Sequence, residues 1–363
     1  MKKVVIFSSG TGGHVYPAYT LAEKYLSEGY DIIWVGTSYG LENKVVKNKK
    51  IQIEHIHASG FRGKNFLEKI KSIFYLGYSL YESFKILRNH RPCLIIGFGG
   101  YVSLSGILVS FVMRIPRIIH EQNAIAGTAN KINYFLSNRV YETFPGSFKS
   151  LNNKILHTGN PVRSSFQKCR QPEEIYLENQ FHLKILVIGG SLGSSFLNTT
   201  IPFALSHFPT QNLAVKHICG HGKLSNLQKK YIEYNLDAEV LEYSDNIDEL
   251  FNWASLVVCR SGSTTISELA SIGRACVLIP FPYATDDHQY KNAEYLSNNS
   301  AAITLKQSDD FIENLVTTLN FLLINDKRLY ALAQNIKKVF PADPRKIIFN
   351  DSLNYMIDKN ENS

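Results

Sequence analysis

The stretch VVIFSSGTGGHVYPA, which runs from Val4 to Ala18, joins an apolar run to a glycine-rich turn. The apolar run is typical of a buried strand, and the residues after the turn fit a helix. Glycine permits positive φ angles and lets a ligand approach the backbone closely. A helix N-terminus then offers free N–H groups and the positive end of its dipole to an anion. The stretch therefore predicts a strand, a turn that can hold a phosphate, and a helix.

Two further stretches repeat this pattern. ILVIGGSLGSS, Ile185 to Ser195, opens the second half of the chain, and GFGGYVS, Gly97 to Ser103, lies inside the first half. Short apolar strands alternate with helices in both halves, which is typical of parallel sheets covered on both faces. The 363 residues suggest two domains, since a domain has roughly 100–200 residues. The sequence therefore predicts an α/β fold with two doubly wound domains, joined near Gly159–Glu174, where polar residues and proline collect.

The expected elements are short and regularly spaced. Predicted strands are Val4–Phe7, Ile32–Val35, Leu94–Ile96, Arg117–His120, Lys184–Ile188, Ala214–Ile218, Ala238–Leu241, Leu256–Val258 and Ala275–Ile279. Predicted helices are Pro17–Ser27, Leu67–Arg88, Thr264–Ser271, Gln289–Ser297 and Asp309–Ile324. Leu94–Met113 has no charged residue and the length of a membrane span, roughly 20 residues. Because four glycines interrupt it, we expect a strand, a glycine loop and a core helix there.

Composition restricts the partners. The net charge of +8 favours an anionic partner such as a nucleotide, a nucleic acid or an acidic membrane surface. No nucleic-acid-binding module is recognisable, so no nucleic acid is expected. The five cysteines are scattered and form no CxxC pair, which is typical of reduced cytosolic thiols. The sequence has no Asp-x-Asp triplet, and we expect neither a metal nor a cofactor.

The glycine turns lack the common nucleotide-binding motifs. None is a G-x-G-x-x-G, none is followed by a Walker lysine, and the second strand, DIIWVGTS, does not end in an acidic residue. Dinucleotide binding is therefore poorly supported. Three glycine turns in one chain favour instead a diphosphate or nucleotide site, to which Ser191 adds a hydroxyl donor.

His14 follows the first turn. At a helix N-terminus the dipole disfavours the imidazolium form, so the ring tends to stay neutral. A neutral imidazole can accept a proton, which suits a general base. The alternative is a histidine that caps its own loop through a hydrogen bond. Both readings are open from position alone.

The second half carries small donors and a carboxylate in VVCRSGSTTISELASIGRACVLIP. Ser263, Thr264 and Thr265 lie at a predicted helix start, and Glu268 follows one turn later. A carboxylate there can bridge two vicinal hydroxyls such as those of ribose, or it can merely complement the helix dipole. Downstream, DDHQYKNAEYL brings Gln289 to another helix start, where an amide can hydrogen-bond a sugar.

Seven motifs together resemble a known family. They are GTGGHVYPA, GFGGYVS, HEQNAIAGTANK, TGNPVR, GGSLGSSFLN, CRSGSTTISE and HQYKNA, in this order along nearly the whole chain. The chain resembles the MurG family of bacterial peptidoglycan transferases, of glycosyltransferase family 28. These enzymes move N-acetylglucosamine from UDP-N-acetylglucosamine (UDP-GlcNAc) to the C4 hydroxyl of the muramyl sugar of lipid I, giving lipid II. The resemblance implies the GT-B fold, in which two Rossmann-like domains face each other across a cleft.

The resemblance also implies a division of the chain. Residues 1–160 would form an N-terminal domain that faces the acceptor and the membrane, and residues 161–340 a C-terminal UDP-sugar-binding domain. Residues 341–363 would form a C-terminal helix and tail that pack back toward the N-terminal domain. Expected partners are UDP-GlcNAc, lipid I, an anionic membrane surface and a cell-wall synthesis complex. The expected location is peripheral, on the cytoplasmic face of the bacterial inner membrane.

Site residues follow by resemblance, motif by motif. His14 matches the proposed base, and Glu121 is a second acidic candidate for catalysis. The residues expected to bind substrate are Thr11, Gly12, Gly13, Asn123, Arg163, Ser191, Ser244, Ser263, Thr264, Thr265, Glu268 and Gln289. His288 stands where some relatives have a second glutamine. Tyr243 and Ser244 stand where some have an aromatic–aliphatic pair beside uracil, which leaves a backbone contact at Ser244.

The implied reaction is direct displacement at the anomeric carbon with inversion. His14 would take the proton of the acceptor hydroxyl. Ser191, Arg163 and a helix N-terminus would stabilise the charge on the departing UDP.

A lipid acceptor requires a membrane contact, for which Phe61–Arg88 is the candidate because it mixes basic and aromatic residues. Its expected apolar face is Phe66, Ile70, Ile73, Phe74, Leu80 and Tyr81. The expected basic rim is Arg62, Lys64, Lys69 and Lys71, extended by Arg114 and Arg117. The alternative is that most of these apolar positions lie in the core.

Two other functions remain open. One is another GT-B enzyme, such as a UDP-GlcNAc 2-epimerase, which has no lipid acceptor. The other is a non-catalytic nucleotide-binding protein. The basic aromatic stretch and GTGGHVYP favour the transferase.

Overall fold

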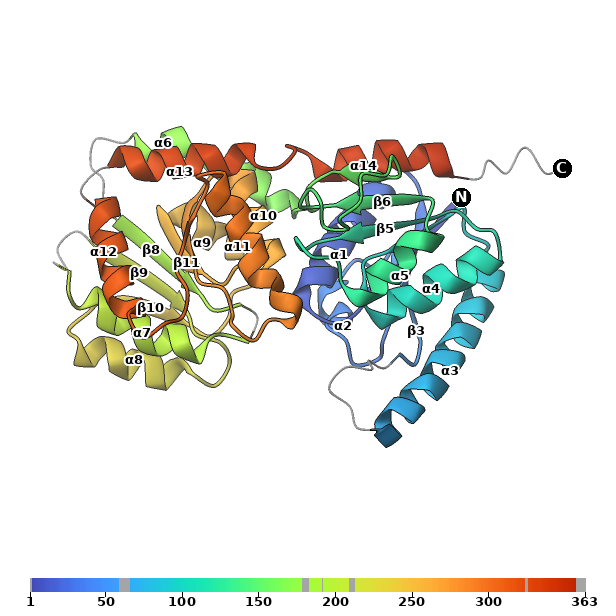
Figure 1. Cartoon of the computed structure of the whole chain (residues 1–363), viewed down its shortest axis with the longest axis horizontal. Helices are drawn as coiled ribbons and strands as arrows, with labels where there is room; N and C mark the ends of the chain where they lie inside the picture. Colours follow the sequence, from blue (N-terminus) through green and yellow to red (C-terminus); the bar gives the residue numbers. More distant parts are fainter. Residues whose placement is uncertain are drawn as a thin grey trace. The chain divides into compact units, whose positions relative to one another are not determined.

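The chain forms two α/β units. The computed structural model describes residues 2–58, 66–177, 183–190, 192–208, 213–323 and 326–356. Unit 1 comprises Met1–Arg163 and Asp343–Ser363, and unit 2 comprises Ser164–Ala342 (Figure 1). Each unit has its own parallel sheet and its own buried apolar clusters.

Unit 1 is built on a seven-stranded parallel sheet with the order β3-β2-β1-β4-β5-β6-β7. The strands are β1 Lys3–Phe7, β2 Asp31–Gly36, β3 Ile51–His55, β4 Leu94–Gly97, β5 Arg117–Glu121, β6 Arg139–Glu142 and β7 Ile155–His157. The helices are α1 Gly12–Ser27, α2 Glu42–Val45, α3 Phe66–His90, α4 Gly100–Val112, α5 Thr128–Leu136 and α14 Pro344–Ser352. A short 3-10 helix, Leu353–Tyr355, follows α14.

Helices cover both faces of this sheet, which explains the uninterrupted apolar runs in β1, β2 and β4. One face packs against α1 and α14, through side chains such as Tyr25 and Ile348. The other packs against α3, α4 and α5, through side chains such as Leu87 and Ile107. Gly106 lets α4 approach the sheet, because a Cβ there would lie 2.5 Å from the ring of Phe7. The carboxyl ends of β1, β4 and β5 are thereby left to the connecting loops.

Unit 2 has a six-stranded parallel sheet with the order β10-β9-β8-β11-β12-β13. The strands are β8 Leu183–Ile188, β9 Leu213–Ile218, β10 Ala238–Leu241, β11 Leu256–Cys259, β12 Ala275–Leu278 and β13 Ile303–Thr304. The α-helices are α6 Pro172–Tyr176, α7 Ser195–Leu205, α8 Leu224–Glu233, α9 Ile247–Trp253, α10 Ser263–Ile272, α11 His288–Asn298, α12 Phe311–Leu323 and α13 Asp326–Lys338. Two 3-10 helices, Ser164–Lys168 and Thr285–Asp287, lie in its connections.

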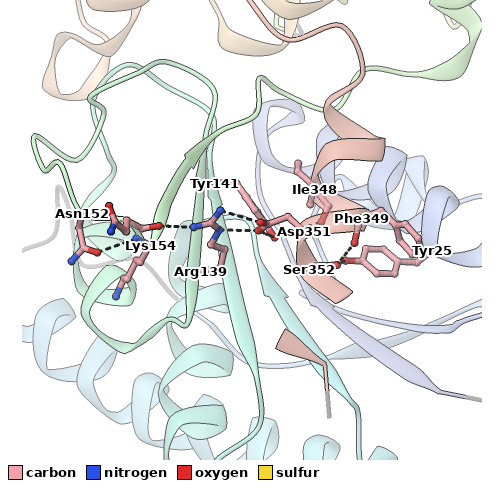
Figure 2. Close-up of polar contacts among 10 residues, drawn as sticks. Tyr25, Arg139, Tyr141, Asn152, Lys154, Ile348, Phe349, Asp351 and Ser352 are labelled. Atoms are coloured by element: carbon pink, nitrogen blue, oxygen red, sulfur yellow. Dashed lines mark hydrogen bonds and ion pairs between the residues drawn. The ribbon is translucent and has the colours of Figure 1, made fainter. Parts of the chain in front are cut away.

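The C-terminal helix α14 completes unit 1 from the far end of the sequence (Figure 2). The Asp351 carboxylate accepts hydrogen bonds from Arg139 Nε at 2.8 Å and Nη2 at 2.9 Å, and from Tyr141 Oη at 2.9 Å. The hydroxyls of Tyr25 and Ser352 are 2.6 Å apart. The Phe349 ring lies edge-on to Tyr25, with centroids 5.2 Å apart. Two aromatic residues and a two-pronged ion pair therefore tie α14 to α1 and β6.

The structure confirms the predicted α/β class and the two doubly wound domains. Every predicted strand is present, and Leu94–Met113 forms β4, a glycine turn and α4 as expected. Within the described residues, no helix is both long and apolar enough to cross a membrane. All five cysteines are free and buried.

Some elements differ from the sequence-based expectation. Helix α1 begins at Gly12, five residues before the predicted start at Pro17, so His14 lies within its first turn. The sequence patterns did not predict β3, β6, β7 and β13. Two of these, β3 and β7, carry half-buried or exposed residues at most positions, and β13 has only two residues. Such strands lack the continuous apolar run that marks a buried one.

Candidate active site

The first glycine turn leads directly into α1. Gly10 has φ +103°, a value that favours glycine, and Thr11 is the N-terminal capping residue. The Thr11 side chain makes no capping hydrogen bond, while its carbonyl accepts from the amides of His14 and Val15. The first amides of an α-helix have no acceptor within the helix. Gly12 and Gly13 therefore present N–H groups at the open end of α1.

His14 lies beside the turn that follows β4. A Cβ on Gly99 would be 3.2 Å from His14 Nε2 and 3.4 Å from Asn130 Nδ2. Gly99 also has φ +89°, so both its conformation and its neighbours require glycine. Three motifs that are far apart in the sequence, GTGGH, GFGG and HEQN…AN, thus meet at the carboxyl edge of β1, β4 and β5.

Glu121 ends β5 and is only 2% exposed. Its Oε1 accepts from the Asn123 amide at 3.0 Å, and its Oε2 accepts from the Gly127 amide at 3.0 Å and from Asn130 Nδ2 at 2.9 Å. Both carboxylate oxygens therefore serve the loop that carries Asn123. Asn130 and the His14 ring both lie beside Gly99, so the hydrogen bond to Asn130 also links Glu121 to the surroundings of His14.

Glu142 repeats this arrangement on the next strand. It is paired in register with Glu121, and it accepts from the amides of Gly146 at 3.0 Å and Ser147 at 3.1 Å. Burial raises the pKa of Glu142, and the nearby Glu121 charge adds to the effect. Two neighbouring carboxylates thus organise two successive loops, 121–127 and 142–147.

His120 is a fully buried neutral imidazole. Its Nε2 donates to the carbonyl of Gly159 at 3.0 Å, and its Nδ1 accepts from Gln122 Nε2 at 3.1 Å. Burial lowers the pKa of His120 to about 4. This ring joins β5 to the TGNPVR segment, where Arg163 places its guanidinium 5.0 Å from the ring centroid of Tyr16 on α1.

Unit 2 repeats the glycine turn with a different set of contacts. Gly193 has φ +67°, and a Cβ there would lie 2.0 Å from the carbonyl oxygen of Cys219, so the turn packs directly on the end of β9. Ser194 caps α7, since its Oγ accepts from the Leu197 amide at 3.3 Å. Ser191, the expected phosphate contact, lies outside the described residues.

The expected ribose turn forms the N-terminus of α10. Ser263 is the first residue of the helix, and Thr264 and Thr265 follow in its first turn. Ser263 and Glu268 are buried, so the Glu268 carboxylate occupies an enclosed position rather than a solvated helix face. The free amides of the first turn and this carboxylate are groups that suit a diol and an anion.

Gln289 lies in the first turn of α11 and is tied to the carboxyl edge of the sheet. Its Oε1 accepts from the Phe281 amide at 3.0 Å, and its carbonyl accepts from Ser261 Oγ at 2.8 Å. Fully buried Asn292 donates from Nδ2 to the Ser261 carbonyl at 3.1 Å. Because the Gln289 oxygen is occupied, its Nε2 is the end that is left to donate to a ligand.

The two departures from the family pattern are surface features. Tyr243 is exposed and stacks on His221, with ring centroids 5.9 Å apart, and Ser244 follows it in the loop after β10. The His288 Nδ1 pairs with the Thr285 carbonyl at 2.7 Å. Within the described ranges, no group of three or more His, Cys, Asp or Glu side chains could hold a metal ion.

Three polar residues at these edges escaped the sequence reasoning. Asn130, Glu142 and Arg260 are all buried. Asn130 lies in the motif HEQNAIAGTANK and Arg260 in CRSGSTTISE, so their places in these motifs could have identified them as candidate site residues. Nothing in the sequence pattern marks Glu142, since its role depends on its register beside Glu121.

Comparisons with known proteins agree with one family over nearly the whole chain. Residues 4–142 match the glycosyltransferase family 28 N-terminal domain, and residues 184–345 match the glycosyltransferase family 28 C-terminal domain. A protein of Methylococcus capsulatus is 38% identical over 345 residues, covering 94% of this chain and 96% of its own length. One of Nitrosomonas europaea is 40% identical over 306 residues, covering 84% and 86%. Both are named UDP-N-acetylglucosamine–N-acetylmuramyl-(pentapeptide) pyrophosphoryl-undecaprenol N-acetylglucosamine transferase.

Solved structures point the same way. The crystal structure of Acinetobacter baumannii MurG superposes with a TM-score of 0.80 at 29% identity, covering 98% of this chain and all of that one. A UDP-GlcNAc 2-epimerase from Neisseria meningitidis gives a TM-score of 0.70 at 12% identity, covering 98% and 100%, and shows the shared GT-B fold alone. The MurG relatives thus share both the fold and 29–40% sequence identity with this chain, whereas the epimerase shares the fold at only 12% identity. The chain belongs to the MurG family of glycosyltransferases, within glycosyltransferase family 28.

Proposed function

We propose that the protein transfers N-acetylglucosamine from UDP-GlcNAc to the C4 hydroxyl of the muramyl sugar of lipid I, with inversion, to give lipid II. The observation that carries this proposal is the identity of 36–40% to transferases of that name over most of the chain. The epimerase alternative has only fold-level likeness in its favour. The ordered motifs and their meeting at the carboxyl edges of the two sheets support the same reaction.

His14 is the general base in this proposal. It is half-buried in the first turn of α1, where the helix dipole favours the neutral ring that a base requires. Glu121 is less suited, because both of its oxygens already accept hydrogen bonds from the loop that follows β5. We therefore assign Glu121 to positioning: it holds Asn123, and it holds Asn130, which lies with the His14 ring beside Gly99.

Donor binding falls to unit 2 and to Arg163. Free amides at the start of α7 contact the diphosphate. Ser191 and Arg163 join them as the family resemblance implies, and Arg163 adds a positive charge. The enclosed Glu268 carboxylate accepts from the ribose hydroxyls, and Gln289 donates to the sugar from Nε2. The Ser244 backbone contacts uracil. Thr11, Gly12 and Gly13 take part in substrate binding, as the family resemblance implies.

The outer helices of unit 1 form the membrane contact. Phe74 and Tyr81 on α3 are 75% and 63% exposed, Val112 on α4 is 78% exposed, and Phe135 on α5 is 79% exposed. These helices cover one face of the sheet, where α3 contacts α4 and α4 contacts α5 (Figure 1). Apolar side chains that solvent would otherwise surround gain free energy at a lipid interface.

Basic residues accompany this apolar surface. Lys85, Arg88, Arg114 and Lys131 are exposed on or next to the same helices. Arg117 is half-buried and places its guanidinium 4.9 Å from the Phe111 ring centroid. Of the expected apolar face, Leu80 packs against the core instead of facing solvent. Arg62 and Lys64, and the side chains of Phe66, Lys69, Ile70, Lys71 and Ile73, lie outside the described residues.

These features support peripheral attachment to an anionic bilayer, on the cytoplasmic face of the inner membrane. Membership of a cell-wall synthesis complex stays a prediction.

One assay separates the candidate reactions. The protein is incubated with UDP-GlcNAc, with and without a short-chain lipid I analogue, and UDP and sugar products are measured. UDP release that requires the acceptor, with a new β-linked disaccharide, supports the transferase. Formation of the 2-epimer without acceptor, or binding without turnover, would contradict it.

A further inference from the structure

Unit 2 buries an arginine at the carboxyl edge of its sheet. Arg260 follows β11 directly and is only 7% exposed. Burial lowers its pKa to about 10, which still leaves it charged at neutral pH. A buried guanidinium is costly unless other groups compensate for the lost hydration.

The guanidinium joins the ends of three strands. Its Nη1 donates to the carbonyls of Ile279 at 3.0 Å and Pro280 at 3.1 Å, just after β12, and to Gln307 Oε1 at 2.9 Å, beyond β13. Its Nη2 donates to Ser194 Oγ at 2.9 Å, in the turn after β8. Arg260 therefore fixes the glycine turn of unit 2 relative to the segment that carries Phe281.

All of these acceptors, in the part of the chain that the structure describes, are neutral oxygen atoms. The aromatic rings of Phe196 and Phe281 lie 5.9 Å and 5.5 Å from the guanidinium, measured to their centroids, and carry no charge either. Four hydrogen bonds thus engage both terminal nitrogens of the guanidinium without neutralising its charge. The remaining positive charge can be balanced by an anion that binds nearby.

The neighbouring helix makes this excess charge larger. Ser194, which accepts from Arg260, is the capping residue of α7, so the guanidinium lies at the positive end of that helix. Two positive features of this kind oppose each other in the absence of an anion. A negatively charged group that binds at the turn would relieve this repulsion.

We propose that Arg260 is a positioning residue for the donor diphosphate: it holds the α7 turn in its binding geometry and supplies the unbalanced charge that favours phosphate over a neutral ligand. The inference rests on the proposed function, because UDP is the ligand considered. It predicts that Arg260 contributes to binding of the phosphates and not of the nucleoside.

Arg274 provides a matched control. It is also buried, and it too donates only to carbonyls among its described acceptors, those of Phe251, Ile272, Gly273 and Arg170. However, it precedes β12, at the opposite edge of the same parallel sheet. A purely structural buried arginine should behave like Arg274.

The test compares UDP with uridine as ligands for the full-length protein. Dissociation constants are measured by calorimetry or by competition against a fluorescent UDP analogue for wild type, Arg260→Gln, Arg260→Lys and Arg274→Gln. We expect Arg260→Gln to weaken UDP binding by about 10- to 100-fold and uridine binding by no more than about twofold. Arg260→Lys keeps the charge, so it should retain part of the preference for UDP even where its thermal stability falls.

Arg274→Gln should lower the unfolding temperature while leaving the ratio of UDP to uridine affinity unchanged. Equal weakening of both ligands by Arg260→Gln would overturn the proposal, as would a ratio that changes as much in Arg274→Gln. Wild-type protein that binds UDP no more tightly than uridine would also overturn it. A lack of acceptor-dependent UDP release, with the preference for UDP intact, contradicts the proposed function and not this inference.

Discussion

In unit 1 the strands β5 and β6 end in Glu121 and Glu142, whereas in unit 2 the strand β11 leads into Arg260. The two sheets share parallel order, glycine turns and helices that start at their carboxyl edges. One edge buries the carboxylates of Glu121 and Glu142, and the other buries the Arg260 guanidinium together with the Glu268 carboxylate. The same backbone construction therefore places different buried charges at the two edges, with a buried cation only in unit 2 among the residues compared.

This difference fits a division of labour between the units. The carboxylates at the edge of unit 1 suit the role proposed for His14, because negative charges in the same region favour the imidazolium that proton transfer would create. The positive edge of unit 2 suits a diphosphate. The fold supplies the position of each loop, and the buried charge determines what that position can bind.

Each unit also buries a neutral histidine, and we expect this burial to make folding stability fall in acid. Burial lowers the pKa of His120 to about 4 and that of His217, in unit 2, to about 3. The unfolded chain takes up a proton near pH 6.5 while the folded chain does not, so stability falls as the pH drops below 6.5. For His120 the loss reaches about 3 kcal/mol near pH 4.

The two tryptophans make this loss measurable unit by unit. Trp34 lies in β2 of unit 1 and Trp253 in α9 of unit 2. Urea unfolding of a Trp253→Phe protein, followed by Trp34 fluorescence from pH 7 to pH 4.5, reports unit 1. His120→Asn should flatten its pH dependence. An unchanged slope in that variant would show that other groups carry the acid sensitivity.

Glu121→Gln tests the positioning role in unit 1. In glutamine, an amide NH₂ group replaces one of the two carboxylate oxygens, so at least one N–H group that now donates to Glu121 would face another donor. The loop that carries Asn123 should therefore shift. We expect kcat to fall by about 30-fold, because small misplacements of reacting groups cost one to two orders of magnitude. The acidic limb of the pH–rate profile should remain. Its disappearance would identify Glu121 as the base.

Asp351→Asn should destabilise unit 1 and leave unit 2 unaffected. The substitution weakens the ion pair with Arg139 and the contact with Tyr141 (Figure 2), which costs about 1–2 kcal/mol. Trp34 fluorescence in the Trp253→Phe background should report this loss, and Trp253 fluorescence in a Trp34→Phe background should not. Asn350→Ala, on the exposed side of α14, is the control and should change neither. Equal losses in both signals would mean that the effect is not confined to unit 1.

The smallest effect concerns the outer surfaces of the units. Phe74→Ser on α3 should weaken sedimentation with anionic vesicles by about fivefold, since part of one aromatic side chain leaves the interface. Ile232→Ser on α8 of unit 2 removes a side chain that is similarly exposed and should have no effect. Vesicle binding that responds equally to both substitutions, or to neither, would argue against α3 as the contact.

The sequence predicts the buried strands and the three glycine turns because their signals are local. Apolar runs and glycines identify β1, β4, β8 and β11 without reference to the rest of the chain. The pairing of Arg139 with Asp351 joins residues 212 positions apart, and no local pattern announces it. The roles of Glu121 and Arg260 cannot be predicted from the sequence either, because the residue type is the same whether the side chain faces substrate or holds a loop.

Ligand-binding and single-turnover measurements on His14→Ala and Arg260→Gln test the division of labour most directly. With saturating UDP-GlcNAc and acceptor, His14→Ala should lower the single-turnover rate by about 100-fold or more while UDP binds normally. Arg260→Gln should raise the dissociation constant of UDP by about 10- to 100-fold with a smaller change in the saturated rate. If His14→Ala weakened UDP binding as much as it slowed turnover, or kept a near-normal rate, the account of two units with separate roles would be wrong.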